Sequence, residues 1–210
     1  MKNRVRVFDN VFTAEEIAEL NNYYADKEYT VTKFESSGQL KYKNKNNDYN
    51  IVDSTPYNII NKKLTEAIGS HQMQYGAYLE SHYPFLPHID TNELFNENNL
   101  YHHSDTFYNN LAVLIPLSEH KDFNTIFWKY WSDKYHTGYD LPIQTEVPVD
   151  FGYMLDHVSP TEKLKLERLE LDTIYNWKVG GLIVWERNQL HSSSDFTKSK
   201  LQKTAITIFL

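Results

Sequence analysis

The sequence predicts a mainly β protein with two α-helices packed outside a β core. Two amphipathic segments lie in the first third of the chain, each preceded by a helix N-cap signal. From residue 73 onward, short apolar runs are broken by Gly, Pro, Asn and Asp, a texture typical of a β-sandwich or barrel. The 210 residues are expected to form a single domain, with 1–72 as N-terminal helical support and 73–210 as the β core.

The first helix is expected over residues 14–25, after a short strand and turn at residues 5–12. Thr13 and Glu16 have the spacing of a capping box, in which each side chain accepts a hydrogen bond from the backbone N–H of the other residue. The apolar positions that follow have helical spacing. Capping box and apolar spacing together predict where this helix begins.

The second helix is expected to begin at Thr55, as N-cap, and to end near Gly69. Pro56 would take the first helical position, where its missing N–H costs nothing. Apolar residues recur every four positions, at Ile60, Leu64 and Ile68. Between the helices, residues 36–50 are polar and lack periodicity, so they are interpreted as a surface loop or hairpin.

The β core is expected to contain several short strands separated by turn-forming residues. The candidate strands are residues 73–80, 111–117, 125–130, 181–185 and 204–210. A long insertion at about residues 131–178 separates two of them. Its leucines fit a helix and a strand about equally badly, so the type of structure in the insertion stays open.

Composition excludes several classes of function. The net charge is −7, from 21 basic and 28 acidic residues, so the chain has no overall field that attracts nucleic acid. Without cysteine, disulfides, thiol catalysis and Cys-ligated metals are excluded, and any metal must bind nitrogen and oxygen ligands. No apolar run approaches the roughly 18 residues of a membrane span, and the start lacks a secretion signal. A cytoplasmic location is therefore expected.

The motif that carries chemistry is His88-x-Asp90. In an extended segment, residues two apart point the same way, so an imidazole and a carboxylate can share one ion. His191, after the apolar run at residues 182–185, is the candidate third ligand. Two histidines and one carboxylate are the ligand set of non-haem Fe(II) oxygenases. The rival pair, His103 and Asp105, lies too close to the next strand to precede a long loop.

The order of these segments resembles the Fe(II)- and 2-oxoglutarate-dependent dioxygenases, particularly their prolyl-4-hydroxylase-like branch. The resemblance covers about 130 of the 210 residues, from Tyr78 to the end. The segments that carry it are Tyr78-Leu79-Glu80, Pro87-His88-Ile89-Asp90, Leu111-Ala112-Val113-Leu114-Ile115-Pro116-Leu117, Phe123-Asn124-Thr125-Ile126-Phe127, Gly180-Gly181-Leu182-Ile183-Val184-Trp185, His191 and Lys203-Thr204-Ala205-Ile206-Thr207.

This resemblance implies a double-stranded β-helix, that is, a cupin-like jelly-roll core. It implies that His88, Asp90 and His191 hold Fe(II) and that Lys203, in the last strand, binds the far carboxylate of 2-oxoglutarate. A buried carboxylate of this kind needs a fixed cation or several donors. Tyr78 resembles a tyrosine that hydrogen-bonds the same carboxylate, and an ordinary half-buried strand tyrosine is the alternative.

Further positions follow from the resemblance or depart from it. Thr207, four residues after Lys203, is expected on the same side of the strand and facing 2-oxoglutarate. Lys198 and Lys200 are the competitors of Lys203, but both precede the apolar strand. Only the Thr of the family's Gly-Gly-Glu-Thr turn is retained, in Asp122-Phe123-Asn124-Thr125. Because the carboxylate ligand Asp90 is present, hydroxylation is favoured over halogenation.

The implied activity is hydroxylation of an unactivated C–H bond, with O2 as oxidant and 2-oxoglutarate decarboxylated to succinate. Peptidyl proline is the substrate favoured by analogy. A small molecule such as an amino acid is the alternative, because the long insertion has room to fold over a small pocket as a lid. No nucleic acid or membrane partner is expected, and the oligomeric state stays open.

Rival interpretations remain. The chain is alternatively a non-enzymatic β-sandwich or a cupin-like metal-binding module, and a zinc hydrolase would also use two histidines and a carboxylate. Trp128, Trp131 and Trp185 are interpreted as core residues, with an aromatic wall for the substrate as the alternative.

Overall fold

The computed structural model describes residues 5–34, 40–47, 54–73, 75–85, 90, 111–131, 170–187, 189–196 and 199–210. Most of the elements in these ranges are strands, as the sequence predicts. The helices are α1 (Ala14–Ala25) and α2 (Thr55–Ile68). The strands are β1 (Arg6–Phe8), β2 (Val31–Phe34), β3 (Leu40–Asn47), β4 (Tyr75–Ser81), β5 (Leu111–Pro116), β6 (Asn124–Trp131), β7 (Leu171–Asn176), β8 (Leu182–Glu186), β9 (Gln189–Ser193) and β10 (Lys203–Phe209).

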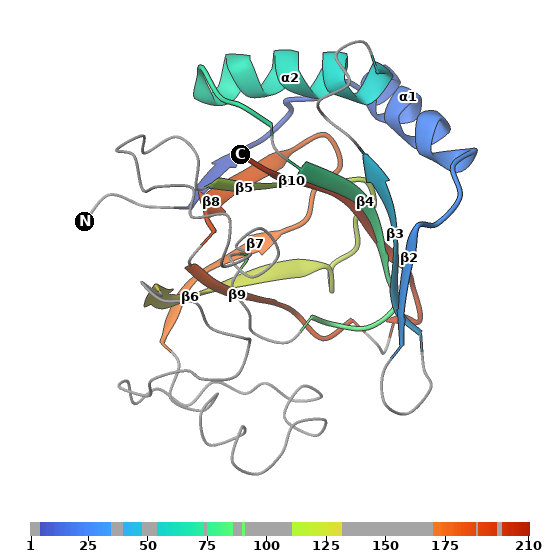
Figure 1. The fold of residues 1–210 in the computed structure, drawn as a ribbon. Coiled ribbons are helices and arrows are strands. Elements are labelled where there is room, and N and C mark those ends of the chain that lie inside the picture. The colour runs from blue at the N-terminus through green and yellow to red at the C-terminus, as the bar shows by residue number, and fades with distance from the viewer. Residues whose placement is uncertain are drawn as a thin grey trace, which may run out of the picture.

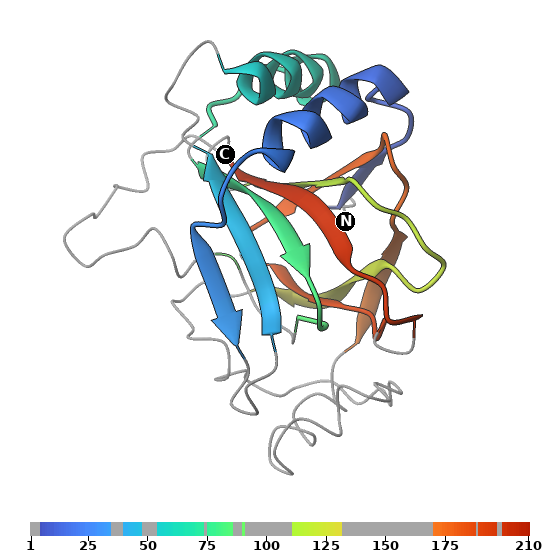
Figure 2. The same ribbon diagram turned by 90° about the vertical axis from the view of Figure 1, so that its right-hand side faces the viewer.

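The strands form two antiparallel sheets that face each other. The larger sheet has seven strands in the order β1-β8-β5-β10-β4-β3-β2, and the smaller has three in the order β7-β6-β9. Both helices cover one face of the larger sheet, and the smaller sheet lies across its other face (Figure 1). The side view in Figure 2 shows the same three layers. This arrangement has the character of a jelly-roll core with helices outside it, which confirms the predicted fold class.

The ends of the helices follow from their capping residues. The Thr13 side chain accepts a hydrogen bond from the Glu16 N–H at 3.2 Å, and the Glu16 carboxylate accepts one from the Thr13 N–H at 2.8 Å, so the predicted capping box is present. The N-cap of α2 is Ser54 rather than the predicted Thr55, because the Ser54 hydroxyl accepts from the Tyr57 N–H. A serine directly before the Thr-Pro pair supplies the better-placed oxygen.

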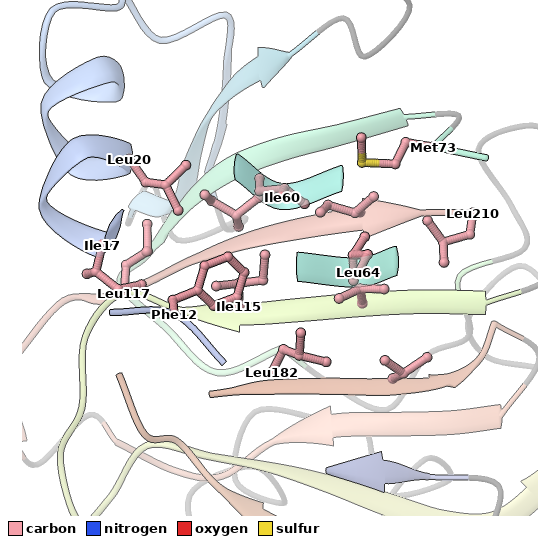
Figure 3. Packing of buried hydrophobic residues seen from close by; sticks show 14 of the residues in the cluster. Phe12, Ile17, Leu20, Ile60, Leu64, Met73, Ile115, Leu117, Leu182 and Leu210 are labelled. Atoms are coloured by element: carbon pink, nitrogen blue, oxygen red, sulfur yellow. The ribbon is translucent and has the colours of Figure 1, made fainter. Parts of the chain in front are cut away.

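One hydrophobic core lies between the helices and the larger sheet. Ile60 and Leu64 of α2 are completely buried there against Ile206 and Ile208 of β10. Figure 3 shows residues of this core, with Ile60 and Leu64 over the strands that carry Ile115 and Leu182. Alternate residues of β10 point to the helices, and the intervening ones, Ala205 among them, point to the smaller sheet.

Replacing Ile60 by alanine is expected to lower the free energy of unfolding by about 2–5 kcal/mol, because it leaves a cavity in this core. Urea unfolding followed by circular dichroism measures the loss. Ile174→Ala is the control, since Ile174 is 49% exposed and its truncation is expected to change stability little. Equal effects of the two substitutions would contradict the assigned core.

The polar segment between the helices, expected as a surface loop or hairpin, contributes strand β3, which forms a hairpin with β2 and also pairs with β4. Two other features go beyond the sequence prediction. The C-terminal end of the insertion is strand β7, paired with β6. The segment around His191, expected as the end of a short turn, is strand β9. Residues 132–169 of the insertion lie outside the described residues. No helix in the described ranges is long and apolar enough to cross a membrane.

Candidate functional site

The fold brings Asp90, in a turn, close to His191, on β9. The Nε2 atom of His191 lies 3.4 Å from Oδ2 of Asp90, and the two side chains are only 8% and 12% exposed. His191 comes from the middle of β9, opposite Phe127 of β6. A hundred residues of sequence separate the two groups, so the fold, not local sequence, creates this pair. His88, the other predicted ligand, lies outside the described residues.

The surroundings of His191 fix its tautomer and its ring orientation. Its Nδ1 atom lies 3.0 Å from the carbonyl oxygen of Gln189, which can only accept a hydrogen bond, so Nδ1 carries the proton. The Phe127 ring stacks on the imidazole at 6.0 Å, and the Trp185 ring lies tilted beside it at 5.1 Å. With Nδ1 directed at this carbonyl, Nε2 is the ring nitrogen that faces Asp90, and it is the atom that a metal ion would bind.

This pair fits a divalent metal ion with nitrogen and oxygen ligands. A carboxylate oxygen and an imidazole lone pair repel each other at short range unless a cation or a proton lies between them. Atoms that bind one ion at about 2.0–2.2 Å each are separated by about 3 Å when they occupy neighbouring positions. Within the described residues, no group of three His, Cys, Asp or Glu side chains is close enough to hold a metal. The described part of the site thus contains two candidate ligands, Asp90 and His191.

A second buried cluster, which includes Phe123, Trp177 and Phe196, lies between the two sheets. Lys203 lies beside it, with 2% of its surface exposed. Its ammonium donates a hydrogen bond of 2.7 Å to the backbone carbonyl of Asn124 on β6. The ammonium also lies over the ring of Trp177 at 3.9 Å and near that of Phe196 at 5.5 Å. No carboxylate among the described residues pairs with it. A buried amino group in this position is suited to an incoming anion, which would favour its charged form.

Burial lowers the pKa of Lys203 well below its ordinary value of 10.5, because desolvation disfavours the charged form. Between the two values the unfolded chain holds a proton on this lysine that the folded protein lacks. The free energy of unfolding of the ligand-free protein is therefore expected to rise with pH through that window. Urea unfolding at several pH values below 10 tests this, and Lys203→Met should lack the rise. Parallel pH curves for the two proteins would contradict it.

Thr207 and Tyr78 lie on opposite faces of the larger sheet. Thr207 points to the side of Lys203, as predicted, since the two residues are four apart on β10, and it pairs with Leu114 and Ala77. Tyr78 pairs with Ile206, stacks on Tyr24 at 5.0 Å and packs against the helix-side core. Burial there raises the pKa of its hydroxyl. The assignment of Tyr78 beside Lys203 is corrected, because strand alternation turns it away.

The remaining candidates are placed as follows. Trp128 is fully buried and donates a 3.2 Å hydrogen bond from its indole N–H to the hydroxyl of Ser192. Trp185 is buried beside His191, so it belongs both to the core and to the site. The Trp131 side chain, and His103 with Asp105, lie outside the described residues.

Sequence reasoning missed Arg187. This residue is 2% exposed and hydrogen-bonds to the main chain of Asp90. The available signal was an arginine standing between an apolar run and the predicted ligand His191, in Trp185-Glu186-Arg187-Asn188-Gln189-Leu190-His191. From the sequence alone, such an arginine is interpreted as an ordinary residue of a surface turn, because most arginines in proteins are exposed.

Several solved protein structures share this fold. The epimerase SnoN from nogalamycin biosynthesis is 13% identical, with a TM-score of 0.58 over 99% of this chain and 78% of its own. HygX from Streptomyces hygroscopicus, solved with nickel and 2-oxoglutarate, is 9% identical, with a TM-score of 0.55 over 98% of this chain and 81% of its own. A prolyl-4-hydroxylase from Pseudomonas putida is 8% identical, with a TM-score of 0.51 over 99% of this chain and 92% of its own.

These similarities establish the fold, which is that of the Fe(II)- and 2-oxoglutarate-dependent oxygenases. SnoN has been solved with Fe3+, α-ketoglutarate and nogalamycin RO, and HygX with nickel, 2-oxoglutarate and hygromycin B. No protein-family model matches the sequence, and no curated protein sequence matches it. The identities are too low to carry substrates or reactions from these enzymes to this chain.

Proposed function

We propose that this protein is an Fe(II)- and 2-oxoglutarate-dependent oxygenase that hydroxylates a C–H bond of a small-molecule substrate. The observation that carries the proposal is the buried pair of Asp90 and His191, in a jelly-roll whose interior also holds the amino group of Lys203. His88, two residues before Asp90, is proposed as the third ligand. When bound, Fe(II) and 2-oxoglutarate supply the oxidation: with O2 they give succinate, CO2 and the hydroxylated substrate.

The side chains of the protein position these groups. His191, with Nδ1 held by the Gln189 carbonyl, keeps Nε2 directed at the ion. Lys203 binds the far carboxylate of 2-oxoglutarate, and Thr207 lies on the same face of β10, where it contacts the same molecule. Burial lowers the pKa of Lys203, and a carboxylate bound beside it would raise that pKa again, because an adjacent anion favours the charged form.

The walls of the site exclude water from it. Phe127 and Trp185 flank the imidazole, so that side of the metal centre is apolar and dry. A dry, rigid surround keeps the ligands in one geometry and restricts access to the substrate.

A small molecule is preferred to peptidyl proline as the substrate. SnoN and HygX, both similar in fold to this chain, have been solved with nogalamycin RO and hygromycin B. The prolyl-4-hydroxylase that shares the fold keeps a peptide as the second candidate. Parallel assays with a small-molecule library and with proline-rich peptides separate the two, since only the true class should couple succinate formation to its own oxidation.

Anaerobic titration with Fe(II) and 2-oxoglutarate tests the proposal. The weak metal-to-ligand charge-transfer band of the ternary complex is expected in the visible spectrum, followed by succinate formation when O2 is admitted. A protein that binds neither Fe(II) nor 2-oxoglutarate would be a non-enzymatic β-sandwich. A protein that binds the metal but never decarboxylates 2-oxoglutarate would be a cupin-like metal-binding module.

A further inference from the structure

Two hydrogen bonds join Asp90 to the turn between β8 and β9. The backbone N–H of Asp90 donates to the carbonyl oxygen of Arg187 at 2.9 Å. In the opposite direction, the Arg187 guanidinium donates from Nη2 to the carbonyl oxygen of Asp90 at 2.8 Å. The same two residues therefore exchange bonds in both directions, which fixes the distance and the orientation of one main chain relative to the other.

The guanidinium of Arg187 is itself held rigidly. The residue is only 2% exposed, and its Cζ atom lies 4.6 Å from the centre of the Phe209 ring on β10. Burying a charged group is costly, so it persists where hydrogen bonds and ring contacts compensate for lost water. Three packed features thus meet at this side chain: the turn, β10 and the backbone of Asp90.

The hydrogen bonds between Arg187 and Asp90 also connect Asp90 to the strand that carries His191. Asp90 is bonded to Arg187, and β9, which begins two residues after Arg187, carries His191. The Oδ2–Nε2 separation of 3.4 Å consequently depends on the position that Arg187 imposes on Asp90. We propose that Arg187 is a positioning residue that holds Asp90 toward His191 and thereby sets the affinity of the site for its divalent metal. This inference rests on the proposed function.

Titration of the metal-free protein with Mn(II), a redox-stable substitute for Fe(II), tests the inference by calorimetry. Arg187→Met is expected to weaken Mn(II) binding by about 10–100-fold, the usual effect of losing a group that orients a ligand. Arg187→Lys keeps the charge and one donor, so it should restore part of the affinity. The affinity for 2-oxoglutarate, measured with saturating Mn(II), should change by less than about twofold.

Lys45→Met is the matched control. Lys45 is also buried, at 6% exposure, and its ammonium donates to a backbone carbonyl, that of Tyr24, and lies 4.6 Å from the Tyr29 ring. It lies on the helix side of the sheet, so the variant should lose stability but keep the wild-type Mn(II) affinity. If Arg187→Met does not fold, Arg187→Lys alone decides: it must bind Mn(II) more weakly than wild type.

The outcomes separate this inference from the function on which it rests. If the wild-type protein does not bind Mn(II), the proposed function fails and the inference fails with it. If the wild-type protein binds Mn(II) and the folded Arg187 variants bind it equally well, only the role of Arg187 is rejected. A loss of affinity in Lys45→Met as large as in Arg187→Lys would also reject it, because the effect would then be general destabilisation.

Discussion

Asp90→Ala is expected to abolish succinate formation and to weaken metal binding by more than about 100-fold. The substitution removes one of the two described candidate ligands, and nothing in the small alanine side chain replaces it. This loss exceeds that expected for a residue that only orients a ligand, for which about 10–100-fold is usual. Quantification of succinate by NMR, together with Mn(II) titration, measures both effects.

Asp9→Ala is the control for this substitution. Asp9 is an exposed carboxylate that forms a surface ion pair of 3.4 Å with Lys178. Unlike Asp90, it is not buried. Its removal is expected to leave turnover and metal affinity unchanged, because exposed ion pairs contribute little. Full coupled turnover in folded Asp90→Ala would eliminate Asp90 as a ligand and, with it, the proposed centre.

Lys203→Met is expected to raise the concentration of 2-oxoglutarate required for half-maximal rate by at least about 30-fold. The methionine side chain has similar length but no charge, so the far carboxylate would be buried without a cation, at a cost of roughly 2–5 kcal/mol. At saturating 2-oxoglutarate the rate should remain near that of the wild type, because the described contacts of Lys203 are with Asn124 and Trp177 and not with Asp90 or His191. Steady-state kinetics at varied 2-oxoglutarate measure this split.

Without ligand, Lys203→Met should have a higher free energy of unfolding than the wild type, because burying the amino group of Lys203 costs hydration free energy that methionine does not lose. Lys45→Met again serves as the control, with an unchanged 2-oxoglutarate requirement. If Lys203→Met also leaves that requirement unchanged, one of the competitors, Lys198 or the exposed Lys200, would have to bind the carboxylate.

Local signals in the sequence predicted the helices and most strands. Thr13 and Glu16 are three residues apart, so their mutual capping needs no information from the rest of the chain. The apolar face of α2 is similarly visible in a four-residue repeat. Strand β9 escaped prediction because it is polar: Gln189, Ser192 and Ser193 are buried together with His191, against the usual preference of strands for apolar residues.

The face of Tyr78 could not be predicted from its own segment. β4 is covered by a core on one side and faces the smaller sheet on the other, so Tyr78 and Leu79 are both partly buried and the strand lacks polar–apolar alternation. Without alternation, the face on which each residue lies depends on pairing with β10, which links residues more than a hundred positions apart. Arg187 was missed for the same reason: its partner, Asp90, is remote in sequence.

The two faces of strand β10 have different roles. Ile206 and Ile208 pack on the helix side of the sheet, whereas Lys203 and Thr207 face the smaller sheet. A saturation mutagenesis screen along it should therefore show a phenotype that repeats every second codon. Polar substitutions at the first set would deplete the protein from cells, and substitutions at the second would leave its abundance intact while reducing turnover. A short linear segment would thus report separately on folding and on chemistry.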